Sequence, residues 1–257
     1  MAQGFTPYIF PRQALLVATV LGCFAFPVRA AEHPIVAAQE TIAEGDLLFA
    51  QGSVEPACLR YELAFATAPE WWYAAYKHAQ CNALEGPTPQ ALYLLSKAAR
   101  GEETLFPVEL ELARYYRTSG EFDLSEHHFL AALGATRGAI EPMVELADLY
   151  EAEGKLSEAL VWLNKAYYFS PGNLTVRSRL ARVCEALGRL YSAEEHLRYL
   201  AVYGVNPRRN MARLARFYQR NGEVKGSARV LRLMGRGHVT PDSRDLPAPK
   251  FPPPGTP

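Results

Sequence analysis

Histidine and cysteine, the residue types that most often bind metals or act as nucleophiles, are sparse in this sequence. It holds 6 histidines and 4 cysteines in 257 residues. His127 and His128 are adjacent, so on a helix they point about 100° apart and make a poor pair of metal ligands. No His-x-x-x-His pair and no glycine-rich phosphate loop occurs in the sequence. We therefore expect a protein that is not an enzyme and that needs neither a metal nor another cofactor.

Charge is balanced overall but unevenly distributed. With 27 basic and 27 acidic residues, the net charge is zero, and no global field favours a nucleic acid or a membrane surface. Between residues 174 and 241, however, 14 basic residues face four acidic ones. Most of these basic residues are arginines, whose planar group makes forked contacts with carboxylates. This part of the chain is therefore expected to attract acidic groups.

The first thirty residues have the pattern of a secretory signal peptide. Arg12 precedes an apolar run of 13 residues, 14–26, which is too short to cross a bilayer of about 30 Å as a helix. Val28-Arg29-Ala30 places small residues where a signal peptidase requires them. We expect cleavage before Ala31 and an extracytoplasmic location, in the first place the bacterial periplasm.

One alternative keeps the protein attached to the membrane. Val20-Leu21-Gly22-Cys23 partly resembles a bacterial lipobox, although the apolar sequence continues beyond the cysteine. Lipidation at Cys23 would anchor the protein in the envelope, and this is the one route by which we expect contact with a membrane.

The organisation of the chain follows from a period of 34 residues. Counting residue 38 as position 1, small residues recur at positions 8 and 20, and large residues recur at position 24. Such self-similarity is the signature of a repeat architecture. The clearest column is position 15, which holds Gly52, Gly86, Gly120, Gly154, Gly188 and Gly222.

Within each period the apolar residues follow helical spacing. In the fourth period, Met143, Leu146, Ala147 and Tyr150 keep the i, i+3, i+4, i+7 rule of one helix face. A second such face follows Gly154. Glycine suits the turn between two helices because it tolerates a positive φ. Each period is therefore predicted to be a helix, a tight turn and an antiparallel helix.

This pattern resembles the tetratricopeptide repeat (TPR), which has small residues at positions 8 and 20, large ones at 11 and 24, and proline at 32. The fourth repeat matches best, whereas the first two depart from the pattern at positions 7 and 11. The resemblance implies an all-α, right-handed superhelical solenoid whose first helices line a concave surface. The six expected repeats are 38–71, 72–105, 106–139, 140–173, 174–207 and 208–241, within a domain of residues 31–241.

Three further expectations depend on the repeat frame. Cys58 stands early in the second helix of repeat one and Cys81 late in the first helix of repeat two; these helices should pack antiparallel, so a Cys58–Cys81 disulfide is one hypothesis and two buried thiols are the other. His78 falls in a core column, which predicts a buried and hydrogen-bonded histidine. The proline-rich segment 242–257 is expected to be an extended, disordered tail, and a docking role for it is the alternative.

The resemblance also implies where a partner binds, because TPR proteins usually contact ligands through positions 2, 5, 6, 9, 12 and 13 of the first helices. Two readings stay open for the charges there. They pair between neighbouring repeats, as Glu151 and Arg182 would, or they hold an acidic or C-terminal peptide over repeats five and six. The implied groove residues are Tyr73, Tyr76, Arg114, Arg117, Glu145, Asp148, Arg179, Arg182, Arg209, Arg213, Arg216 and Arg220.

The leading interpretation is a scaffold or adaptor that binds a segment of a protein partner and supports assembly of a cell-envelope complex. A second interpretation, which rests on the resemblance, is a lipoprotein that assists assembly of a pilus or a secretion pore. A third is a polysaccharide-binding component of an export system, in which Trp71, Trp72, Tyr73 and Tyr76 stack on sugars.

Overall fold

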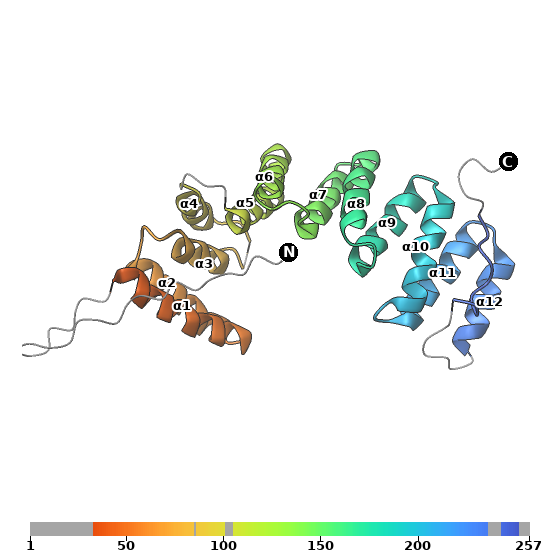
Figure 1. The fold of residues 1–257 in the computed structure, drawn as a ribbon, viewed down its shortest axis with the longest axis horizontal. Coiled ribbons are helices and arrows are strands. Elements are labelled where there is room, and N and C mark those ends of the chain that lie inside the picture. Colours follow the sequence, from red (N-terminus) through yellow and green to blue (C-terminus); the bar gives the residue numbers. More distant parts are fainter. Residues whose placement is uncertain (1–32, 85, 101–104, 236–242, 252–257) are drawn as a thin grey trace, which may run out of the picture. The chain divides into compact units, whose positions relative to one another are not determined.

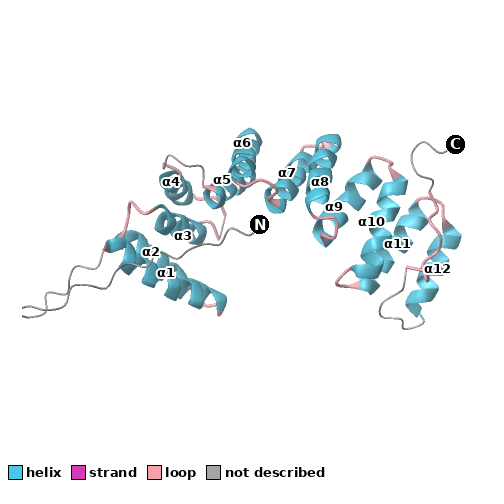
Figure 2. Cartoon of the chain, viewed as in Figure 1, coloured by secondary structure: helices cyan, strands magenta, loops and turns pink. Residues whose placement is uncertain are grey.

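The structure is a computed structural model that describes residues 33–84, 86–100, 105–235 and 243–251. Every helix or strand that it contains in these ranges is an α-helix (Figure 2). None of the described helices combines the length and the apolar character needed to cross a bilayer. The expected signal peptide, residues 1–30, and Cys23 lie outside the described residues.

The helices follow one another as six antiparallel pairs (Figure 1). Each first helix packs against the second helix of its own pair, and each second helix packs against the first helix of the next pair. This arrangement is the predicted all-α solenoid. The pairs are α1 (Pro34–Ala50) with α2 (Val54–Thr67), α3 (Trp72–Asn82) with α4 (Pro89–Ala98), α5 (Phe106–Ser119) with α6 (Phe122–Ala135), α7 (Ile140–Ala152) with α8 (Leu156–Phe169), α9 (Leu174–Ala186) with α10 (Leu190–Tyr203), and α11 (Pro207–Arg220) with α12 (Val224–Gly235).

The turn inside each pair uses the periodic glycine as predicted. All six glycines of that column have a positive φ. At Gly154 the value is 76°, and the following Lys155 N–H donates to the Tyr150 carbonyl of α7 at 2.8 Å. Residues with a Cβ adopt this conformation only with strain, which explains why glycine recurs where the chain reverses.

The apolar core is continuous in the C-terminal repeats and divided in the N-terminal ones. One large cluster of buried residues runs from Leu110 to Leu246. Two small clusters fill repeats one and two; the first consists mainly of alanine, and the second also includes Val108 and Leu112 of α5. His78 is half-buried against the Phe65 ring, but its Nδ1 has no hydrogen-bond partner within the described structure. The expectation of a hydrogen-bonded ring at His78 is therefore wrong for that atom.

A disulfide joins the first two repeats. Cys58 on α2 and Cys81 on α3 are bonded, with their Cα atoms 5.6 Å apart. This is the pairing proposed from the antiparallel packing of these two helices. Cys184 is a free thiol buried in the large core.

The tail differs from the expectation of a disordered end over residues 243–251. Leu246 is buried in the large core cluster, and the Phe251 ring lies 5.5 Å from the ring of Phe217 on α11. The backbone of Lys250 and Phe251 donates to Glu194 on α10. Ordering the tail costs conformational entropy, and its proline-rich composition alone does not compensate for that cost. Packing against the repeats does so instead.

Candidate partner-binding groove

Ion pairs connect the first helices of neighbouring repeats, and a sequence separation of 31 residues recurs among them. This separation joins position 9 of one repeat to position 6 of the next. Lys77 contacts Asp46 at 2.7 Å between repeats one and two. The same register recurs in Arg114–Glu145, Arg179–Asp148 and, from position 12 to position 9, Arg182–Glu151. The same contact geometry recurs between neighbouring repeats, and residues of opposite charge occupy it.

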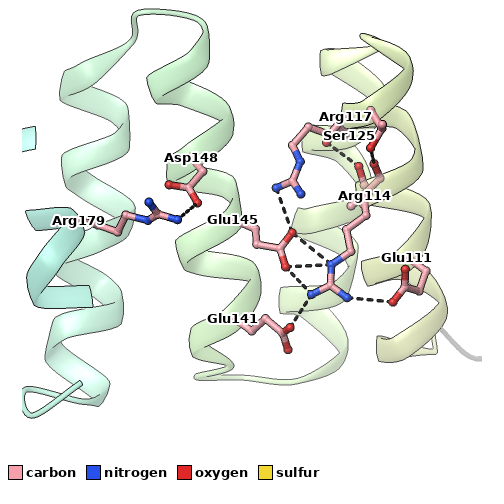
Figure 3. A network of polar contacts seen from close by, with 10 residues as sticks. Glu111, Arg114, Arg117, Ser125, Glu141, Glu145, Asp148 and Arg179 are labelled. Atoms are coloured by element: carbon pink, nitrogen blue, oxygen red, sulfur yellow. Dashed lines mark hydrogen bonds and ion pairs between the residues drawn. The ribbon is translucent and has the colours of Figure 1, made fainter. Parts of the chain in front are cut away.

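The densest network surrounds Arg114 of α5 (Figure 3). Its guanidinium donates to Glu145 and Glu141 of α7 and, at 2.9 Å, to Glu111 one turn earlier on α5. Arg117 adds a second contact to Glu145 at 3.0 Å. Burial alone would lower the pKa of Arg114, but the hydrogen bonds and charges of these carboxylates outweigh it and raise that pKa. The opposite charges of Arg114 and Glu145 therefore satisfy each other.

A second set of pairs links α7 and α9. Asp148 forms ion pairs with Arg179 at 2.7 Å and with Arg182 at 3.4 Å, and Glu151 forms one with Arg182 at 2.8 Å. The pairing of Glu151 with Arg182 that the sequence suggested is confirmed. Six of the predicted groove residues thus contact one another across repeats three to five, which favours the pairing interpretation there. They are Arg114, Arg117, Glu145, Asp148, Arg179 and Arg182.

The pattern breaks between repeats five and six. Here the residues at position 9 of repeat five and position 6 of repeat six are Arg182 and Arg213, which carry the same charge. Arg213 donates to the Ser178 hydroxyl at 2.9 Å, and Arg216 donates to the backbone of its own helix. Within the described structure, neither of them nor Arg209 forms an ion pair with a carboxylate, whereas Arg220 contacts Glu185 at 2.7 Å.

The pKa of Arg213 reflects the excess of positive charge around it. Burial lowers the pKa of its guanidinium, and the positive charges of Arg209, Arg182 and Arg216 lower it further, while Glu185 opposes them. An arginine in such surroundings gains more from an incoming anion than one that already faces a carboxylate.

Two adjoining hollows give access to these arginines. One, of about 370 Å³, lies between α9, α10 and α11, and the other, of about 650 Å³, extends toward the turn at Gly204. Arg182, Arg209 and Arg213 line both of them. Arg182 already pairs with Asp148 and Glu151, but Arg209 and Arg213 form no ion pair within the described structure and border open space large enough for carboxylate side chains.

The aromatic zone of repeat two has a different character. The rings of Trp71, Trp72, Tyr73 and Tyr76 lie 5.3 to 6.4 Å from their neighbours and half-bury one another. A hollow of about 410 Å³ beside this zone is lined by Phe49, Leu84 and the Lys77–Asp46 pair, among others. Only Tyr73 and Tyr76 are stacked face to face, and the other ring pairs meet at tilted or edge-on angles.

Comparison with known proteins identifies the fold. No known family profile and no curated sequence matches the chain. Among solved structures, PilF of Pseudomonas aeruginosa superposes with a TM-score of 0.67 at 15% identity, covering 80% of this chain and 93% of that one. PilW, described as a widely conserved type IV pilus biogenesis factor, gives 0.67 at 12% identity with coverages of 80% and 96%. A tetratricopeptide repeat protein from Parabacteroides merdae gives 0.61 at 14% identity, with 82% and 83% covered. The chain has the TPR fold.

The TPR frame also explains which contacts sequence reasoning missed. Asp46 was not singled out, although its pair with Lys77 occupies the same two repeat positions as Arg114–Glu145. The signal was present: opposite charges 31 residues apart recur along the array. In the described part of the chain no three His, Cys, Asp or Glu side chains gather as a metal site would require.

Proposed function

We propose that this protein is a non-catalytic TPR scaffold that binds an acidic segment of a partner protein along α9 and α11. The observation that carries the proposal is the like-charged Arg182–Arg213 junction, where every comparable charged junction elsewhere in the array pairs opposite charges. Carboxylates of a bound segment would supply the missing charge in the two hollows.

The cell envelope is the proposed location. The signal-like N-terminus supports export, and a disulfide suits an oxidising compartment such as the periplasm. Mass spectrometry of the mature protein distinguishes the two envelope forms. An N-terminus at Ala31 supports a soluble periplasmic protein, and a diacylated Cys23 supports a lipid-anchored one.

A more specific role in pilus assembly is the second candidate. The observation that favours it is the likeness to PilW, a type IV pilus biogenesis factor. Crosslinking from Ser178 and Asn210, which line the larger hollow, in cells that make this protein tests it. Capture of pilus or secretion-pore components supports this role, and capture of other envelope proteins supports the general scaffold.

Charge reversal tests the groove itself. We expect the triple variant R209E/R213E/R216E to bind a fluorescent hexaglutamate peptide about 100-fold more weakly than the wild type, because each arginine contributes a charge-assisted hydrogen bond. The matched control is R208E/R229E/R232E, which makes the same charge change at exposed arginines outside both hollows. Equal losses in the two variants, read by fluorescence anisotropy, would show that net charge rather than the groove binds the peptide.

A further inference from the structure

The proline-rich tail binds the second helix of repeat five as a peptide ligand would. Leu246 is 4% exposed and joins the core, while Phe251 forms a T-shaped ring pair with Phe217 of α11. Between these two anchors the segment carries Pro247 and Pro249, which lack a backbone N–H and favour an extended chain. Two apolar anchors at the ends of an extended segment are a common way to bind a peptide.

The polar contact of the tail is made by one buried carboxylate. Glu194 of α10 is 1% exposed and accepts the N–H of Lys250 at 2.9 and 2.8 Å and the N–H of Phe251 at 3.0 Å. Its fourth hydrogen bond comes from the Tyr218 hydroxyl at 2.6 Å. A carboxylate is tolerated at such depth when donors surround it, and the tail supplies most of them.

At the Pro247 end of the segment, α10 provides a hydrogen-bond donor instead of an acceptor. Arg198, one turn after Glu194 on α10, donates to the carbonyl of Pro247. The site therefore offers an acceptor to backbone N–H groups and a donor to a backbone carbonyl. These contacts recognise an extended backbone, and only the apolar anchors recognise side chains.

The array contains an internal comparison for this site. Tyr150 donates to Glu126 at 2.6 Å, and these residues occupy the same repeat positions as Tyr218 and Glu194, 24 residues apart. Glu126 is half-buried and receives no tail. The tyrosine–glutamate pair is thus a recurring feature of the repeats, and the tail is an additional ligand of the pair formed by Tyr218 and Glu194.

We propose that α10 and α11 form a second peptide-binding site, specific for an extended proline-containing segment with a terminal aromatic anchor, which residues 246–251 occupy in cis. The site is separate from the arginine groove, because Glu194 and Arg198 project from a second helix whereas the groove arginines project from first helices. A segment of the same chemistry competes with the tail for this site.

A tail variant tests the proposal in the full-length protein. L246A/F251A removes both anchors and leaves the site intact. We expect a fluorescent peptide of residues 243–251, amidated at its C-terminus, to bind this variant at least 10-fold more tightly than the wild type, whose own tail fills the site. Adding either E194Q or R198M to the tail variant should abolish binding, and adding E126Q should leave it unchanged.

Trypsin shows independently whether the site is open. The peptide bond on the carboxyl side of Lys250 should be cleaved slowly in the wild type and at least 10-fold faster in L246A/F251A, since docking holds this bond against α10. Equal cleavage rates would overturn the proposal. So would peptide binding that survives both E194Q and R198M, or an absence of binding in a tail variant whose Lys250 site has opened.

Discussion

At the scale of single residues, Arg177 makes a charged side chain part of the interior. It is 7% exposed, and its hydrogen bonds run to the Pro171 carbonyl at 2.6 Å, the Tyr167 hydroxyl and Nδ1 of His196. Its guanidinium also lies 3.5 Å from the centre of the Tyr199 ring. Neutral acceptors and an aromatic face thus stabilise the cation. This arrangement requires His196 to stay neutral, because Nδ1 must accept.

The titration of His196 gives a prediction at this scale. Burial, and then the charge of Arg177, lower the pKa of His196 to about 4 in the folded protein, below its ordinary value of about 6.5. As pH falls through this window, the unfolded chain takes up a proton that the folded protein does not, so the free energy of unfolding falls. We expect a change from about pH 7 to about pH 4.5 to cost on the order of 2 to 3 kcal/mol through this residue.

The variant H196Q keeps an acceptor for Arg177 and does not titrate, so its acid destabilisation should be smaller by that amount in urea unfolding. The same substitution at His127, which is exposed on α6, is the control for the loss of a histidine at an exposed position. Identical pH dependence in the wild type and H196Q would contradict the assignment.

At the scale of helices, the Cys58–Cys81 bond compensates for a small core. The cluster that joins repeats one and two contains mostly alanines, which bury little area each. The disulfide closes a loop of 23 residues, which should stabilise these repeats by about 3 kcal/mol.

Because a solenoid transmits stability through nearest neighbours, C58S/C81S should lose hydrogen-exchange protection in α1 to α3 and keep it in α9 to α11. A thiol reductant should reproduce this effect in the wild type and add nothing in the variant. Uniform loss along the chain would contradict local stabilisation.

The helices themselves were largely predictable from sequence, and their contacts only in part. Helices α3, α5, α7 and α9 begin 34 residues apart, since the turn that needs a positive φ recurs with Gly154 and its equivalents. Pairing between first helices was predicted for Glu151 and Arg182 but not as a register shared by the array. The tail could not be predicted, because Glu194 lies 56 residues before Lys250 and local composition gives no sign of that contact.

At the scale of the whole molecule, the division of the core predicts that the array does not unfold in one step. The large cluster extends from Leu110 to Leu246, whereas repeats one and two hold two small separate clusters, the second of which also includes Val108 and Leu112 of α5. Repeats that bury less apolar surface should unfold at lower denaturant concentration when coupling is limited to neighbours. The unfolding of the N-terminal repeats is therefore expected to precede that of repeats three to six.

The three tryptophans of the sequence allow this order to be measured. Trp71 and Trp72 pack against the two small clusters, and Trp162 packs against the large one. In W162F, fluorescence reports the N-terminal repeats; in W71F/W72F, it reports repeat four. We expect the urea midpoint of the first variant to be the lower one, and reduction of the disulfide to widen the gap, because it weakens only the N-terminal repeats. Far-UV circular dichroism of each variant should show two steps. Coincident midpoints by both probes would instead mean that coupling between repeats two and three exceeds the difference in their cores.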